Sequence, residues 1–155
     1  MKPETNLILL DLDHTLIYGS YAESETAELL FSHNKFLKVY KRNFAEDLIE
    51  LCKLKADIII YTTALRGYAK TISIKLNINP IELWSRKNCK IVNGKHKKTI
   101  KAEWLHLYDK IIIIDDSPNV WLCQDEKIVF LVPEEFRGDV KDVGLVKIIN
   151  ELKQI

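Results

Sequence analysis

The chain has 155 residues and a mass of 18.0 kDa, a common size for one domain and enough to bury about two-thirds of the unfolded surface. Apolar residues make up 47% and charged residues 29% of the chain, so the composition excludes an intrinsically disordered or a collagen-like protein. Lysine plus arginine (23) nearly balances aspartate plus glutamate (22), so the net charge alone gives no sign of a polyanionic partner.

The first apolar run, residues 6–11, predicts a strand buried on both faces of a parallel sheet, because four apolar side chains precede a carboxylate. Two β-compatible pieces follow at residues 25–31 and 35–41, and the short polar segment between them predicts a small hairpin. Residues 43–54 have apolar side chains at helical spacing, with Asn43 as the predicted N-cap. The first third of the chain therefore predicts a strand, a hairpin and a helix.

Strands and helices then alternate to the end of the chain. Buried strands are predicted at residues 56–61, 110–115 and 127–132, and helices at about 65–76, from Ser117-Pro118 through Trp121, and at 140–152. This order is typical of an α/β domain with a doubly wound parallel sheet and right-handed crossovers, in which ligands bind at the carboxyl ends of the strands. There is no linker or internal repeat, so we expect one domain over residues 1–155.

The N-terminal segment and the cysteines indicate the cellular compartment of the protein. Residues 1–6 have no long apolar stretch of the kind found in a secretory signal, and no apolar run approaches the ~20 residues that cross a bilayer. The three cysteines, Cys52, Cys89 and Cys123, are far apart and form no C-x-x-C pair. We therefore expect reduced thiols in an intracellular protein, cytoplasmic or nuclear, with no membrane span; the oligomeric state is not written in the sequence.

Polar residues follow three predicted strands at the edge where a ligand is expected. Asp11, Thr62 and Asp115 each end or directly follow an apolar strand, and Asp13 adds a carboxylate two residues after Asp11. One such residue alone is more often a turn former or a helix cap. Together, two carboxylates offer a nucleophile and a proton donor or acceptor, with a divalent cation to hold their charge.

The segment Asp11-Leu-Asp-His-Thr-Leu-Ile17 resembles the first motif of haloacid-dehalogenase (HAD) superfamily phosphatases, most closely the RNA polymerase II carboxy-terminal-domain phosphatases and NLI-interacting-factor-like proteins. Three further segments resemble motifs of that family in the same order: Val39-Tyr-Lys-Arg42, Tyr61-Thr-Thr-Ala-Leu-Arg-Gly-Tyr-Ala69 and Ile111-Ile-Ile-Ile-Asp-Asp-Ser-Pro118. The resemblance covers about residues 6–136. It implies a HAD-like Rossmannoid fold with a β-hairpin insertion at about residues 22–41.

The resemblance also implies a Mg²⁺-dependent phosphatase that forms an aspartyl-phosphate. Asp11 would attack the phosphorus of a phosphomonoester, and Asp13 would protonate the leaving oxygen and then activate water. The carboxylates of Asp11, Asp115 and Asp116, with the backbone carbonyl of Asp13, would hold Mg²⁺, which favours hard oxygen ligands. Thr62 would hydrogen-bond a phosphoryl oxygen.

The same resemblance places a lysine beside the phosphoryl group. Lys98 is assigned to that position, with its neighbour Lys97 as the alternative. Thr63, beside the second-motif threonine, and Arg42, after the predicted hairpin, are further predicted substrate-binding residues. The usual alternative for a lysine is a solvated surface charge.

Two features bear on the substrate. Seven basic residues and no acidic one lie from Arg86 to Lys101; beside the crevice they would attract anionic substrates, and otherwise they form a solvated face. About 50 residues separate Asp13 from Thr62, too few for a large cap domain as well as a helix and a strand. The open crevice favours phosphoserine or phosphothreonine proteins. A nucleic-acid-end phosphatase, a small-molecule phosphatase and a catalytically inactive scaffold are the alternatives.

Overall fold

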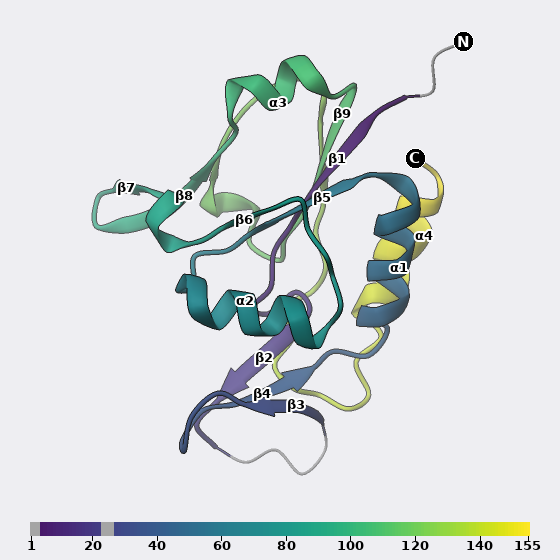
Figure 1. The fold of residues 1–155 in the computed structure, drawn as a ribbon. Coiled ribbons are helices and arrows are strands. Elements are labelled where there is room, and N and C mark those ends of the chain that lie inside the picture. The colour runs from purple at the N-terminus through teal and green to yellow at the C-terminus, as the bar shows by residue number, and fades with distance from the viewer. Residues whose placement is uncertain (1–3, 23–26) are drawn as a thin grey trace.

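A computed structural model describes residues 4–22 and 27–155. Its centre is a five-stranded parallel sheet in the order β11-β9-β1-β5-β6 (Figure 1). The strands are β1 (Asn6–Leu10), β5 (Asp57–Tyr61), β6 (Glu82–Trp84), β9 (Lys110–Ile114) and β11 (Ile128–Leu131). The predicted doubly wound α/β fold is confirmed, and β6 is an edge strand that the sequence analysis missed.

Alternate side chains of the central strands face two separate cores. The helices are α1 (Ala45–Lys55), α2 (Arg66–Lys75), α3 (Ala102–Leu107) and α4 (Gly144–Lys153). Ile8 and Leu10 of β1 pack in a core shared with α1, α2 and α4. Leu7 and Leu9 pack in a second core with Trp104 of α3. Because both faces of β1 are covered, its apolar run is continuous rather than alternating. No helix in the described ranges is long and apolar enough to cross a bilayer.

Between β1 and α1 along the chain, three strands form an antiparallel sheet with the order β2-β4-β3, at the bottom of Figure 1. Its strands are β2 (Ile17–Ser20), β3 (Glu28–Ser32) and β4 (Lys38–Lys41). The predicted hairpin corresponds to β3 and β4, although residues 25–26 of its first piece lie outside the described residues. β2 was not predicted from the sequence; it pairs with β4 and makes the insertion three-stranded.

A third small sheet, with the order β10-β8-β7, covers the face opposite α1 and α4. Its strands are β7 (Lys90–Val92), β8 (Lys95–Thr99) and β10 (Trp121–Leu122), and two 3₁₀ turns, η1 (Arg86–Asn88) and η2 (Pro118–Val120), precede β7 and β10. The helix predicted from Ser117-Pro118 through Trp121 is wrong: the chain makes one 3₁₀ turn there, and Trp121 begins β10, where it pairs with Lys98 of β8.

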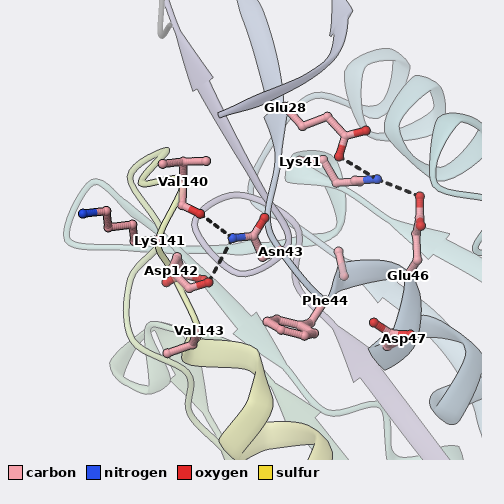
Figure 2. A pocket seen from close by; sticks show the side chains of 11 residues that line it. Glu28, Lys41, Asn43, Phe44, Glu46, Asp47, Val140, Lys141, Asp142 and Val143 are labelled. Carbon is pink, nitrogen blue, oxygen red and sulfur yellow. Dashed lines mark hydrogen bonds and ion pairs between the residues drawn. The ribbon is translucent and has the colours of Figure 1, made fainter. Parts of the chain in front are cut away.

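The start of α1 also differs from the prediction. Phe44, not Asn43, precedes the helix with a left-handed φ of 68°, and no side chain caps it. The Asn43 amide instead donates to the carbonyls of Val140 (2.7 Å) and Asp142 (3.1 Å), as Figure 2 shows. Because these contacts fix residues 140–142 in a loop, α4 begins at Gly144 rather than at the predicted residue 140.

Candidate active site

The carboxyl ends of β1 and β9 bring the predicted carboxylates together. Asp11 directly follows β1, Asp115 directly follows the neighbouring β9, and the two strands pair in parallel along their length. One carboxylate oxygen from each of Asp11, Asp115 and Asp116 lies within 4.8 Å of the other two. The structure thus brings the carboxylates of these two strand ends together.

Lys98 lies in the centre of this cluster. Its Nζ is 3.0 Å from Oδ1 of Asp11 and 2.7 Å from Oδ2 of Asp115, and its side chain is only 2% exposed. Burial lowers the pKa of Lys98, but the attraction of the two carboxylates outweighs burial and raises that pKa, so the amine stays charged. Lys97 lies elsewhere: its Nζ donates to the carbonyl of Asn119 at 3.0 Å.

The four carboxyl groups of the site carry raised pKa values. Burial is the largest cause in each, because a carboxylate loses hydration when it is enclosed. It raises the pKa of Asp115 to about 6, although Lys98 opposes the shift. One ammonium does not neutralise Asp11, Asp13, Asp115 and Asp116. Their hard oxygens and surplus negative charge therefore fit a divalent cation such as Mg²⁺.

Two side chains that the sequence analysis did not assign to the site hold its carboxylates. The Thr15 hydroxyl donates to Oδ2 of Asp11 at 2.8 Å and accepts from the backbone N–H of Asp116 at 3.1 Å. The Trp121 indole donates to Oδ2 of Asp115 at 2.9 Å. Thr15 lies inside the first motif, so its position signals a role. Trp121 gives no such signal, since an aromatic near a strand is usually core.

Tyr68 of α2 contacts the second carboxylate of the first motif. Its hydroxyl donates to Oδ1 of Asp13 at 3.3 Å. The insertion holds this tyrosine from the other side, because the ring of His33 packs edge-on against it with centroids 5.0 Å apart. A Cβ at Gly19 of β2 would lie 2.9 Å from the Tyr68 hydroxyl. The insertion thus fixes the tyrosine that contacts Asp13.

A pocket of about 140 Å³ opens onto the cluster. Its lining consists of Asp11, Asp13, His14, Thr63, Lys98, Asp115, Asp116, Ser117, Val120 and Glu135. The structure brings Thr63 into this pocket. Thr62 lies behind it, nearly fully buried, and its hydroxyl accepts a hydrogen bond from the N–H of Ala64 at 3.0 Å.

Arg42 does not line the pocket. Its guanidinium is fully buried and donates to the Asp142 carboxylate through Nε (2.7 Å) and Nη2 (3.0 Å). The other donations go to the carbonyls of Glu134 (2.7 Å), Thr15 (3.1 Å) and His14 (3.4 Å). These bonds occupy its five N–H groups and leave none for the substrate contact predicted from the sequence. Arg42 instead ties the loop after β1 to the segment before α4.

A larger hollow of about 450 Å³ lies at the start of α1, apart from the carboxylates (Figure 2). Three of its charged side chains pair with one another: Lys41 contacts Glu28 at 3.0 Å and Glu46 at 2.8 Å. The smaller pocket is therefore the candidate active site, because it alone of the two contains the clustered carboxylates and the buried lysine.

Comparison with known proteins identifies the family of the chain. Residues 6–155 match the family model described as NLI interacting factor-like phosphatase. The chain is 25% identical over 159 residues to a probable C-terminal domain small phosphatase of Dictyostelium discoideum, covering 96% of the chain and 51% of that protein. It is 20% identical over 162 residues to CTD nuclear envelope phosphatase 1B of Danio rerio, covering 94% of the chain and 65% of that protein.

The fold is similar to the solved structure of Fcp1, an essential RNA polymerase II CTD phosphatase, with a TM-score of 0.60 and 17% identity. The match covers 97% of this chain and 49% of that one. It supports a HAD-like fold. The chain thus spans about half the length of most of these relatives.

Proposed function

The chain belongs to the NLI interacting factor-like phosphatase family, and on this premise we propose that it is a Mg²⁺-dependent phosphomonoester hydrolase acting on phosphoserine or phosphothreonine proteins through an aspartyl-phosphate. The observation that carries the proposal is the buried contact of Lys98 with Asp11 and Asp115. Burying three charges is costly and adds little to stability, so such a cluster is better explained by phosphate chemistry than by folding.

In the first step, a carboxylate oxygen of Asp11 forms a bond to the phosphorus, and the bond from phosphorus to the leaving oxygen breaks. Asp13 gives its proton to the leaving oxygen. The raised pKa of Asp13, caused mainly by burial, supports this role because more of the acid form exists near neutral pH. Lys98 and the Thr15 hydroxyl orient the Asp11 carboxylate for the attack.

In the second step, Asp13 takes a proton from a water molecule, whose oxygen bonds to the phosphorus. The bond between phosphorus and Asp11 breaks, inorganic phosphate is released, and Asp13 is again protonated for the next cycle. Lys98 and Thr63 are proposed to contact the phosphoryl oxygens, since both line the pocket. Thr62, directly behind Thr63, is retained as a second phosphoryl-binding candidate.

The carboxylates of Asp11, Asp115 and Asp116 would hold Mg²⁺, and the family resemblance adds the backbone carbonyl of Asp13. One carboxylate oxygen from each of the three aspartates lies within 4.8 Å of the other two, which supports this assignment. When bound, Mg²⁺ would offset the repulsion between these carboxylates and the substrate phosphate.

We also propose that the chain works as one catalytic domain in an intracellular compartment. The family match runs over residues 6–155, with the small sheet of β2, β3 and β4 as its insertion. Cys52, Cys89 and Cys123 are free thiols, which suits a reducing environment.

The first test is turnover of p-nitrophenyl phosphate with Mg²⁺ by the wild type and by Asp11→Asn. We expect the substitution to abolish turnover without lowering the melting temperature, and EDTA to stop the wild-type reaction until Mg²⁺ is restored. Asp47→Asn, at an exposed position on α1, is the matched control and should keep full activity. Turnover by folded Asp11→Asn would exclude Asp11 as the nucleophile, and indifference to EDTA would exclude the metal.

A further inference from the structure

The hairpin of β7 and β8 carries lysines that have no acidic partner. Lys90, Lys95 and Lys97 form no ion pair with any carboxylate in the described ranges. Two nearby lysines differ: Lys98 is bound by the carboxylates of the site, and Lys101 contacts Glu103 at 2.8 Å. Three positive charges without an acidic partner therefore lie on the six residues that pair in this hairpin.

The strand register places these three lysines on one face. Lys90 lies directly opposite Lys97, and Val92 lies directly opposite Lys95. Opposed residues of an antiparallel pair share a face, and alternate residues of a strand do so too, whereas Lys98 points to the other face. Like charges that lie opposite each other repel, so a bound anion would reduce the repulsion among these lysines. We call Lys90, Lys95 and Lys97 the basic face.

The basic face adjoins the candidate active site. Lys98, the next residue in β8, reaches Asp11 inside the pocket. On the opposite face, the Nζ of Lys97 donates to the carbonyl of Asn119, which lies between two pocket-lining residues, Ser117 and Val120. Figure 1 shows the β7–β8 hairpin projecting from the body of the domain, where an extended substrate can reach it.

The composition of this region favours a polypeptide over a nucleic acid. Single-stranded nucleic acids are bound by basic grooves that include aromatic side chains on which bases stack. Residues 86–101 contain no Phe, Tyr or Trp. Val92, which lies opposite Lys95 and is half-buried, is the apolar residue on the same face as the lysines.

We propose that the basic face binds acidic or additionally phosphorylated residues that flank the target phosphoserine or phosphothreonine in a substrate protein. This inference rests on the proposed function and narrows its substrate class to chains with clustered negative charge. The hairpin supplies attraction outside the pocket, so it lowers KM for such chains and leaves the chemical step unchanged.

The test compares Lys90→Gln/Lys95→Gln with Lys147→Gln/Lys153→Gln, which removes the same charge from exposed positions on α4. Lys97 is left intact because it also holds the Asn119 carbonyl. Substrates are p-nitrophenyl phosphate and three phosphoserine peptides that differ only in acidic, neutral or basic flanks. We expect the hairpin variant to raise KM for the acidic peptide about three- to tenfold at low salt, and the α4 variant less than twofold. kcat and the aryl phosphate KM should not change, and 0.5 M NaCl should remove the difference.

Equal KM values for the acidic and neutral peptides in the wild type, with aryl phosphate turnover intact, would overturn the inference while leaving the phosphatase in place. Tighter competition by a single-stranded oligonucleotide than by the acidic peptide, lost in the hairpin variant, would also overturn it in favour of nucleic acid. If the wild type does not hydrolyse the aryl phosphate, the proposed function fails. Fluorescence anisotropy of the acidic phosphopeptide then tests whether the basic face binds it. Weaker binding by the hairpin variant than by the wild type supports this role of the basic face, and equal binding refutes it.

Discussion

Lys98 separates two buried carboxylates that would otherwise repel each other. Its contacts come from three segments, since Asp11 follows β1, Asp115 follows β9 and the lysine belongs to β8. The sequence predicted this lysine only through a resemblance, because nothing local distinguishes it from Lys97. The structure separates them by burial: Lys98 is enclosed, and Lys97 is bound to a surface carbonyl.

Lys98→Gln should therefore destabilise the metal-free protein by about 3 kcal/mol at pH 7.5, because it leaves buried carboxylates without a counter-charge. The loss should be smaller at pH 5, where the carboxyl groups protonate. Urea denaturation in EDTA measures both values. Lys97→Gln is the matched control and should cost less than about 1 kcal/mol. Similar losses for the two variants would contradict the assignment of Lys98.

Tyr68→Phe tests how Asp13 is held. The variant loses the hydrogen bond to Asp13, so proton transfer to the leaving oxygen should suffer. We expect kcat/KM to fall about tenfold for phosphoserine, a poor leaving group, but about twofold for p-nitrophenyl phosphate, whose leaving group needs little help. Tyr108→Phe removes a similar bond to Asp57 at the start of β5 and should change neither value. Equal losses on both substrates would show that Tyr68 does not act through Asp13.

The raised carboxyl pKa values predict how metal binding varies with pH. The folded-state pKa of Asp115 is about 6, above the ordinary 3.8, so this group favours the folded state below about pH 4 and that contribution is lost as pH rises through 6. Protons also compete with Mg²⁺ for the same oxygens. Mg²⁺ should therefore raise the melting temperature by several degrees at pH 7.5 and by less than about one degree at pH 5. Differential scanning fluorimetry checks this, and an equal rise at both values would exclude these carboxylates as ligands.

The elements that the sequence missed are short and depend on distant partners. β7 has three residues and β2 has four. The pairing of β2 with β4 leaves no pattern in the local sequence that would predict it. The start of α1 shows the same limit, because Asn43 is a good cap by local rules but finds carbonyls almost a hundred residues away. By contrast, the runs that became β1, β5, β9 and β11 are strong local signals.

The start of α4 offers a test of the Arg42 link. A Cβ on Gly144 would collide with Nη2 of Arg42, whereas a Cβ on Gly67 in α2 would meet nothing within 4 Å. Gly144→Ala should therefore cost about 1–3 kcal/mol of unfolding free energy through the displaced guanidinium. Gly67→Ala, the same substitution in another helix, should be neutral or stabilise by up to about 1 kcal/mol. Equal effects in urea denaturation would mean that the Arg42 contacts do not constrain α4.

At the scale of the whole molecule, the described residues between β1 and α1 in the chain form only the small sheet of β2, β3 and β4, where a cap domain would otherwise enclose the site. The spacing in the sequence predicted that no large cap domain fits there, and the alternation of buried strands and helices predicted the parallel sheet. The sequence did not predict that β8 places Lys98 between the carboxylates of Asp11 and Asp115, because this placement depends on how the small sheet packs against the central one.

This open arrangement predicts a preference for large substrates. Because no lid covers the pocket in residues 4–22 and 27–155, the pocket has few groups with which to enclose a small metabolite. We expect kcat/KM for phosphoserine peptides to exceed that for glucose 6-phosphate by at least about tenfold, measured by phosphate release. A sharp preference for one small metabolite would contradict the open-site interpretation.

β1 is the first strand of the chain but lies in the middle of the sheet, bonded to β5 on one side and β9 on the other. During synthesis on the ribosome, Asp11 at its end, the proposed nucleophile, is therefore made long before Asp115, the carboxylate that lies beside it. Arg42 lacks its counter-ion until Asp142 has also been synthesised. Nascent chains that end before this point carry every residue of the first motif, yet we expect them to hydrolyse nothing, so the proposed activity should arise only when the domain is nearly complete.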